Sequence, residues 1–107
     1  MPNKPQPPYW TVIFPSQRTE EDAEGYGVMA KRMAELAEAQ PGFLGMDSAR
    51  DANGFGITVS YWQSLDAIEA WRNHPEHLCA QALGRSKWYA EFEVHIAKVE
   101  RTYHFNV

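Results

Sequence analysis

Alternating hydrophobic and polar positions predict strands near the start of the chain and in its middle. Residues 9–14, Tyr-Trp-Thr-Val-Ile-Phe, are rich in β-branched and aromatic side chains, which favours a first strand that Pro15 closes. Residues 43–50 and 55–62 predict two more strands, and the Asn53-Gly54 pair between them is a strong hairpin signal. Alternate residues of the third strand point to opposite faces. One face carries Gly56, Thr58, Ser60 and Trp62, and the other carries Phe55, Ile57, Val59 and Tyr61.

A helical spacing of apolar residues follows the first strand. Apolar side chains recur every three or four positions between residues 26 and 37, which predicts an amphipathic helix. Thr19 is the expected N-cap, and we expect a regular helix only from about Tyr26, because Gly25 and Gly27 weaken its start. Pro41 and Gly42 end it. The apolar stripe consists of Tyr26, Met29, Ala30, Met33, Leu36 and Ala37.

The segment from residue 64 to residue 87 predicts two short helices. Ser64 is suited to cap the first. Pro75 interrupts the pattern, but proline is favoured at the first position of a helix, so a second helix starts there and runs to about Lys87.

The C-terminal part predicts more strand and completes the topology. Apolar residues alternate over residues 88–105, but their parity switches between Ile96 and Val99, which indicates a β-bulge or a break into two strands. The order β-α-β-β-α-β predicts an α+β, ferredoxin-like fold with helices on one face of an antiparallel sheet. A homodimer in which two sheets form a barrel would cover the other face. Residues 1–8 predict an extended, disordered leader, and residues 9–107 one domain.

Composition and charge narrow the range of partners. A chain of 107 residues with 44% hydrophobic and 22% charged residues fits one globular domain. Its net charge of −4 argues against nucleic-acid and anionic-membrane partners, which need a basic face. The single cysteine cannot form an internal disulfide, and no apolar run is typical of a signal peptide or a membrane span. We therefore expect a soluble cytoplasmic protein.

Three stretches of the chain resemble a known family. They are QPGFLG at residues 40–45, GITVSYWQSLDAIEAWRNHPEH at residues 56–77 and GRSKWY at residues 84–89. They resemble the antibiotic biosynthesis monooxygenase family of dimeric α+β barrels. The resemblance implies this fold and a homodimer. It also implies an activity from a family that includes cofactor-free monooxygenases of aromatic polyketides, haem-degrading enzymes and quinol oxidases.

The same resemblance allows a comparison with the haem-degrading branch. There a helix carries a tryptophan and, ten residues later, the histidine that binds iron, and an asparagine on the first strand completes the set. Trp71 matches the tryptophan, but Gln81 stands at the position of the histidine, and an amide does not replace an imidazole as axial ligand. The first strand has no asparagine. The comparison disfavours haem and implies no tightly bound cofactor, although His77, one turn before Gln81, leaves a shifted ligand open.

Two histidines and the cysteine lie close together in sequence, but their spacing does not predict a metal site. A transition metal needs three or four ligands from one face, and Cys79 points about 200° round the helix from His77. Pro75 makes His74 a helix cap. We interpret Cys79 as a small core residue, because residues two apart on a helix do not face each other and His77 cannot activate its thiol.

The remaining aromatic and polar residues predict a pocket for a flat, partly polar ligand. Trp71, Leu78, Gln81 and Arg85 fall near one helical stripe. In the alternative interpretation, Trp71 and Leu78 pack helix against sheet while Gln81 and Arg85 face solvent. The substrate-binding candidates are Trp71, Gln81, Trp62, Tyr61, Arg85 and Tyr89.

Oxygenation without a cofactor needs a base that forms the substrate anion and donors that stabilise the developing oxyanion or peroxide. His77 is the candidate base, because imidazole titrates near neutral pH. Trp71 is the candidate for stacking on the substrate ring, and Gln81, Tyr61 and Tyr89 are the candidate hydrogen-bond donors.

Two functions are therefore expected from the sequence. The first is a cofactor-independent monooxygenase that oxidises a small aromatic or quinone-type substrate with O₂. The alternative is a non-enzymatic dimer that binds a small ligand, haem included, in a stress or regulatory role.

Overall fold

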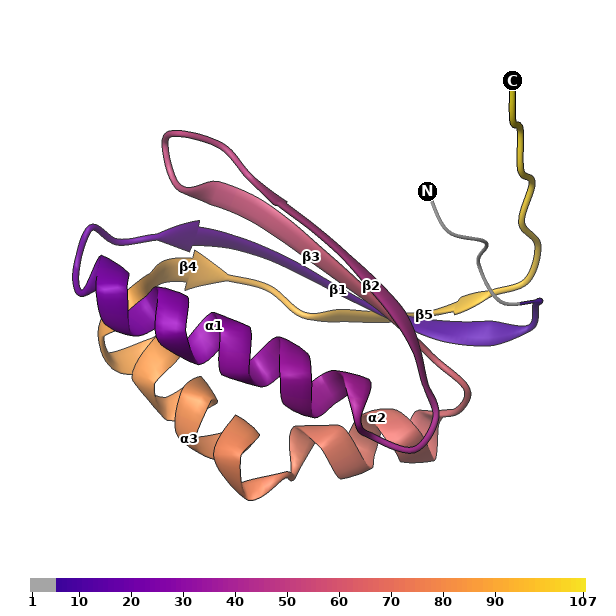
Figure 1. The fold of residues 1–107 in the computed structure, drawn as a ribbon, viewed down its shortest axis with the longest axis horizontal. Coiled ribbons are helices and arrows are strands. Elements are labelled where there is room, and N and C mark those ends of the chain that lie inside the picture. Colours follow the sequence, from indigo (N-terminus) through magenta and orange to yellow (C-terminus); the bar gives the residue numbers. More distant parts are fainter. Residues whose placement is uncertain (1–5) are drawn as a thin grey trace.

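One antiparallel sheet and one layer of helices make up residues 6–107, the part of the chain that the computed structural model describes (Figure 1). The strands are β1 (Tyr9–Arg18), β2 (Phe43–Arg50), β3 (Phe55–Trp62), β4 (Tyr89–Phe92) and β5 (His95–Val99). The helices are α1 (Ala23–Glu38), α2 (Leu65–Arg72), α3 (Pro75–Leu83) and the π-helical turn η1 (Gly84–Trp88). The predicted α+β class and β-α-β-β-α-β order are confirmed. Most of the predicted leader lies outside the described residues.

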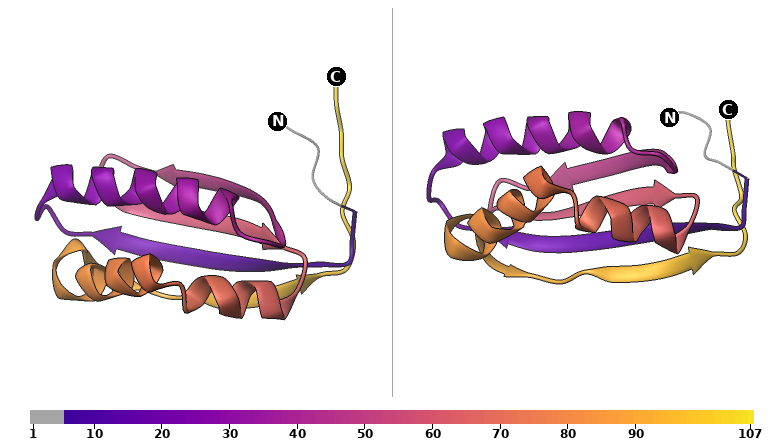
Figure 2. Two further views of the ribbon diagram at one scale, coloured as in Figure 1. Left: turned by 60° about the horizontal axis from the view of Figure 1, so that its bottom comes forward. Right: turned by 90° about the horizontal axis from the view of Figure 1, so that it is seen from below.

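The strands run in the order β2-β3-β1-β4, and β5 pairs with the other end of β1. All pairings are antiparallel. The predicted hairpin joins β2 to β3, with Gly54 at a φ of 90° and the Asp51 carboxylate accepting two backbone N–H groups of the turn. Figure 2 shows the helices on one side of the sheet, so no element of residues 6–107 covers the other side.

The first strand continues through Pro15, where the sequence predicted its end. Pro15 lies opposite Ile57 of β3, and its carbonyl oxygen accepts the Glu93 N–H at 3.0 Å. The N–H and C=O of one strand residue point to the same neighbour. The nitrogen of Pro15 therefore faces the gap between β4 and β5, where no regular ladder needs its hydrogen.

The predicted C-terminal strand is divided into two, but the break at residues 93–94 lies before the parity switch, because Ile96 and Val99 both belong to the uninterrupted β5. Phe92 ends β4 opposite Ser16, and β5 begins at His95 opposite Ile13. The strand ends at Val99, earlier than the predicted Phe105. Residues 100–107 are exposed and extend away from the domain (Figure 1).

Asp22, and not the predicted Thr19, caps α1, so the helix is regular from its first residue. One oxygen of the Asp22 carboxylate, Oδ1, accepts the Gly25 N–H at 3.1 Å. The other, Oδ2, accepts from Lys87 Nζ at 2.9 Å and from Trp88 Nε1 at 3.3 Å. A Cβ at Gly25 would lie 2.1 Å from Oδ2, so glycine is what lets the carboxylate fold over the helix start.

The predicted junction between the two short helices is confirmed. The Ser64 hydroxyl accepts the Ala67 N–H at 3.1 Å and caps α2, and His74 Nδ1 accepts the Glu76 N–H at 3.2 Å and caps α3. Cys79 is exposed, so its interpretation as a core residue was wrong. It lies outside the stripe that α3 turns inward. The half-buried positions of α3 are His77, Ala80, Gln81 and Leu83.

Side-chain contacts settle which face of the sheet meets the helices. Arg50 of β2 donates to the Tyr26 hydroxyl of α1 at 3.3 Å and lies opposite Gly56 of β3. Because alternate residues share a face, the Trp62 side of β3 faces the helices. The other face is open and partly apolar, with Phe55 and Ile57 exposed by 45% and 41%.

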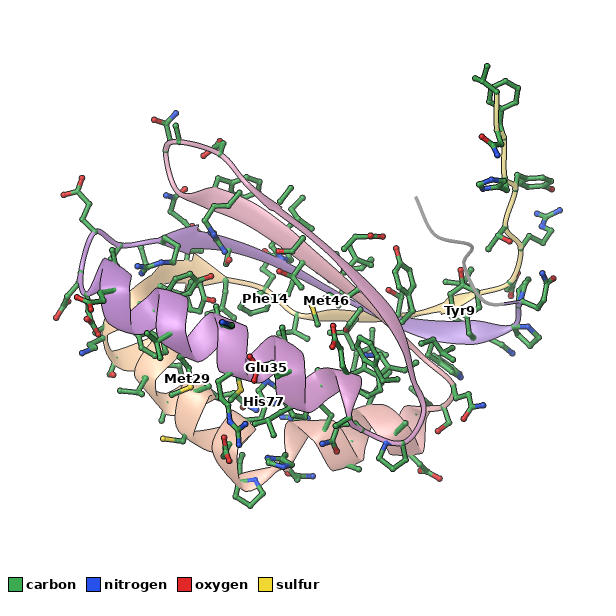
Figure 3. All side chains as sticks on the ribbon, in the orientation of Figure 1. Tyr9, Phe14, Met29, Glu35, Met46 and His77 are labelled. Carbon is green, nitrogen blue, oxygen red and sulfur yellow. The ribbon has the colours of Figure 1, made fainter. Side chains whose placement is uncertain are left out.

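Several side chains on the helix side of the sheet are only partly covered. Val12, Phe14 and Met46 lie on the helix side of the sheet, yet they are only half-buried, and Ser48 beside them is exposed. Figure 3 labels Phe14 and Met46 in the middle of the sheet, behind α1. A fully packed core would bury such side chains. The helices therefore do not cover these side chains completely.

Candidate functional site

His77 and Trp71 form the centre of the predicted site. The imidazole and indole rings are stacked, with centroids 4.2 Å apart and planes 13° apart. His77 Nδ1 lies 2.9 Å from the Trp71 carbonyl oxygen, which also accepts the His74 N–H at 3.1 Å at the end of α2. A carbonyl oxygen only accepts, so Nδ1 carries the hydrogen and Nε2 is the basic nitrogen.

The surroundings of His77 favour its neutral form. Burial lowers the pKa of His77 below its usual value of 6.5, because desolvation disfavours the imidazolium. The hydrogen bond to the Trp71 carbonyl opposes this effect, and the nearby His74 adds to it. A neutral imidazole at neutral pH is the form that a general base requires.

Gln81 and Arg85 are tied to the helix junction. Gln81 Nε2 donates to the Arg72 carbonyl oxygen at 3.0 Å, at the end of α2, and Gln81 Oε1 accepts from Arg85 at 3.4 Å. Arg85 is exposed, and Leu78 of the same predicted stripe is 47% exposed. Gln81 therefore links α3 to the end of α2, and neither the Leu78 nor the Arg85 side chain is enclosed.

Trp62 and Tyr61 lie on opposite faces of β3. Trp62 is fully buried on the helix side, where its indole N–H donates to the Ser60 hydroxyl at 2.9 Å. Tyr61 lies on the open face and donates to the Asp47 carboxylate at 3.0 Å. Burial and this carboxylate raise the pKa of Tyr61 to about 12. Within one chain Tyr61 does not share a site with His77.

Tyr89 belongs to a second cluster, which the sequence did not predict as a unit. Its hydroxyl lies 3.3 Å from the Tyr26 hydroxyl, which also accepts from Arg50 at 3.3 Å. Phe14 packs edge-on against the Tyr89 ring at 5.4 Å. Tyr26 was predicted only as part of the α1 apolar stripe. Strand alternation could have found Arg50, because it places this cation on the sheet face that meets the helices.

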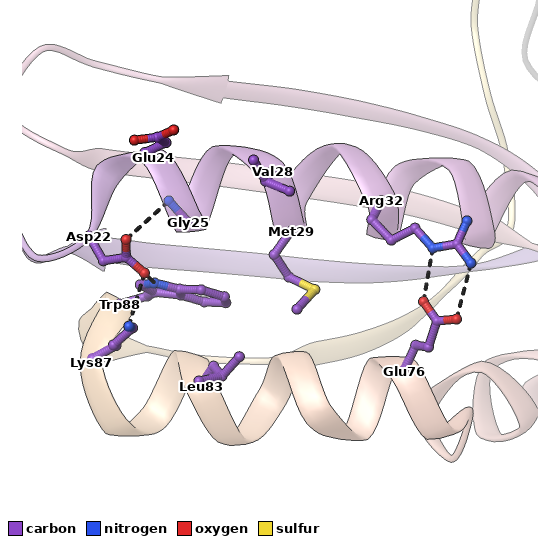
Figure 4. A pocket seen from close by; sticks show the side chains of 10 residues that line it. All are labelled: Asp22, Glu24, Gly25, Val28, Met29, Arg32, Glu76, Leu83, Lys87 and Trp88. Carbon is purple, nitrogen blue, oxygen red and sulfur yellow. Dashed lines mark hydrogen bonds and ion pairs between the residues drawn. The ribbon is translucent and has the colours of Figure 1, made fainter.

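A surface groove of about 600 Å³ runs between α1 and α3 (Figure 4). One ion pair at each end bridges the two sides: Asp22 with Lys87 at 2.9 Å, and Arg32 with Glu76 at 2.9 Å. The Glu76 carboxylate raises the pKa of Arg32, and Arg32 lowers that of Glu76. The apolar side chains along it are Val28, Met29, Leu83 and Trp88. The site residues predicted from the sequence do not line this groove.

The described residues also bear on metal binding and membrane insertion. Within residues 6–107 no three His, Cys, Asp or Glu side chains are grouped closely enough to hold a metal ion. No helix in the same range is long and apolar enough to cross a membrane.

A sequence profile described as "Antibiotic biosynthesis monooxygenase" matches residues 11–83, from the third residue of β1 to the end of α3, and this range includes the Trp71–His77 pair. The chain belongs to the antibiotic biosynthesis monooxygenase family. It is 57% identical over 97 residues to the uncharacterized protein YqjZ of Bacillus subtilis (strain 168), covering 91% of this chain and 84% of that protein.

Solved structures of proteins from several bacteria have the same fold. SnoaB of Streptomyces nogalater, a cofactor-independent oxygenase, superimposes with a TM-score of 0.76 at 18% identity, covering 90% of this chain and 97% of that one. PA3566 of Pseudomonas aeruginosa gives a TM-score of 0.72 at 16% identity, covering 92% and 99%. At these identities the likeness establishes a common fold.

Proposed function

We propose that this chain is a cofactor-independent monooxygenase that oxidises a small, electron-rich aromatic or quinone-type molecule with O₂. The observation that carries the proposal is His77, whose lowered pKa favours the neutral imidazole and whose Nδ1 is held by the Trp71 carbonyl, so that Nε2 carries the basic lone pair. Family membership and the likeness to SnoaB, itself a cofactor-independent oxygenase, support the same reaction class.

The reaction needs no reductant besides the substrate. His77 Nε2 removes a proton from an acidic ring CH₂ group, and the carbanion passes one electron to O₂. The resulting carbon radical and superoxide combine to form a C–O bond. The peroxide takes the proton back from the imidazolium, loss of the second C–H hydrogen breaks the O–O bond, and water leaves. The CH₂ group becomes a carbonyl, with one oxygen atom of O₂ in the product and the other in water.

Oxygen uptake with an anthrone-type probe tests this role of His77. Wild-type protein is expected to consume one O₂ for each quinone formed. His77→Gln removes the base but keeps a polar side chain, and we expect it to lower kcat by about 10²-fold or more. The control is Cys79→Ala, on the exposed side of the same helix, which should leave kcat unchanged. Unchanged turnover in His77→Gln would remove the imidazole from the mechanism.

We also propose that two copies pack through the open sheet face. This face carries exposed apolar side chains that no element of the described chain covers, and an unpartnered apolar surface is typical of an interface. Ile57→Glu, in the middle of that face, is expected to shift the mass measured by light scattering from a dimer to a monomer. A dimer that persists in Ile57→Glu would place the interface elsewhere.

The proposal includes the absence of a tightly bound cofactor, and hemin tests it directly. Titration of the protein with hemin is expected to leave the Soret band as it is in buffer, because Gln81 stands where the haem-degrading relatives have their ligand. A Soret shift that disappears in His77→Ala would instead favour the haem-binding alternative.

A further inference from the structure

The cluster of Tyr26, Tyr89 and Arg50 contains one more hydrogen-bond donor than it uses. Arg50 donates to the Tyr26 oxygen, and a single hydrogen occupies the 3.3 Å contact between the two phenol oxygens. Two phenols carry two hydrogens. The second has no acceptor among residues 6–107, whichever tyrosine carries it. The chain of hydrogen bonds that starts at a guanidinium therefore ends in a free phenolic O–H.

Positive charge surrounds this donor. The Arg18 guanidinium lies 3.9 Å from the centroid of the Tyr26 ring, and Arg50 contacts the Tyr26 hydroxyl. No ion pair found within residues 6–107 involves either arginine. Their hydrogen bonds go to backbone carbonyls, a serine hydroxyl and a phenol, all of them neutral. A ligand oxygen that carries negative charge is therefore favoured at this point.

The Tyr89 ring is held in place by close contacts, and two phenylalanine rings pack beside it. A Cβ at Gly84 would come within 3.0 Å of Tyr89 Cδ2, so the ring lies directly against the helix backbone. Phe14 contacts the same ring edge-on at 5.4 Å, and Phe92 packs on Phe14 at 5.4 Å. The two phenol oxygens are farther apart than the usual separation of about 2.8 Å. A ligand oxygen can therefore take over one hydrogen at little loss.

We infer that the Tyr26–Tyr89 pair, polarised by Arg50, anchors the oxyanion of a phenolate or enolate ligand, whose ring lies along Phe14 and Phe92. The inference rests on the proposed function for the class of ligand. It assigns positioning of the substrate oxygen to residues separate from the base, His77. Neither Tyr26 nor Arg50 was a site residue in the sequence-based prediction.

Binding of two matched probes tests the anchor without any turnover. 4-Nitrophenolate carries the oxyanion, and 4-nitroanisole has the same ring with a methyl ether in its place. We expect wild-type protein to bind the phenolate at least about tenfold more tightly in calorimetry, the range for a hydrogen bond to a charged group. Tyr26→Phe and Tyr89→Phe keep the rings and should each reduce this ratio towards one. Tyr103→Phe is the matched control, because that side chain is 88% exposed in the C-terminal segment.

The outcomes separate this inference from the proposed function. An unchanged probe ratio in both tyrosine variants, or no phenolate preference in the wild type, overturns the anchor even if oxygen is consumed. A ratio lost in both variants, together with no oxygen uptake on any phenol, retains the anchor and removes the oxygenase. A purely structural role of the tyrosines would change stability but not the ratio between the two probes.

Discussion

Two glycines in the first turns of α1 should respond in opposite ways to alanine. At Gly25 an added Cβ would lie 2.1 Å from Asp22 Oδ2 and 2.6 Å from Cγ, so the carboxylate must rotate away. That rotation breaks its cap on the helix and its bonds to Lys87 and Trp88. At Gly27 an added Cβ meets nothing within 4 Å.

The expected magnitudes follow from these contacts. Alanine in place of glycine inside a helix stabilises by about 0.5–1 kcal/mol, and this is the whole effect expected for Gly27→Ala. Gly25→Ala makes the same gain but loses a helix cap, typically about 1 kcal/mol, and the indole hydrogen bond of Trp88, about 1 kcal/mol. We add nothing for the partly exposed Lys87 ion pair. The net expectation for Gly25→Ala is a loss of about 1 kcal/mol.

Urea unfolding followed by circular dichroism measures the difference. Both variants should be compared with the wild type at one protein concentration, because association of copies adds to the apparent stability. The two free energies of unfolding should differ by about 2 kcal/mol, with Gly27→Ala the more stable. A Gly25→Ala variant as stable as Gly27→Ala would show that the Asp22 carboxylate does not hold the helix start.

Three further predictions concern the described side chains. Burial lowers the pKa of His77 below 6.5, so the unfolded chain binds more protons than the folded one near that pH. The free energy of unfolding should therefore fall as the pH drops below about 6.5. Urea titrations at several pH values measure this slope, and His77→Gln should remove it. Trp62→Ala removes the largest fully buried side chain and should cost about 3–5 kcal/mol in the same assay, whereas a loss under 1 kcal/mol would contradict its place in the core. Burial is the main cause of the raised pKa of Tyr61 and the Asp47 carboxylate adds to it, so Asp47→Asn should lower that pKa only part of the way from about 12. Phenolate absorbance measures the change, and an unchanged pKa would mean that the carboxylate does not contribute.

Periodicity was sufficient to predict the elements and their order, because each face of a strand or helix has its own hydrophobic pattern. The Asn53-Gly54 hairpin and the helix junction at Pro75 are local features, and both are confirmed. The C-terminal break was predicted at the wrong place, because the parity switch after Ile96 falls inside β5. Pro15 was misjudged because its tolerance depends on a gap in a strand almost 80 residues away.

The site was less predictable, since its contacts join segments that are distant in sequence. The Trp71–His77 stack is local to one helix junction, and the sequence had proposed both residues as candidates. Asp22 caps α1 with its carboxylate held by Lys87 and Trp88, which are more than 60 residues away in the sequence. Local sequence signals favoured Thr19 because they do not include these distant contacts. The link between Arg50 and Tyr26 needed the sheet register and the position of α1 together.

Oxygen transfer by chelator-treated, flavin-free protein is the most direct test of the proposed reaction. Incubation with an anthrone-type probe under ¹⁸O₂ should give the quinone with one ¹⁸O atom and the second ¹⁸O atom in water, at a rate that dialysis against chelator does not change. Absence of oxygen uptake above the buffer rate with electron-rich aromatic probes, or incorporation that disappears after chelation, would contradict a cofactor-independent monooxygenase.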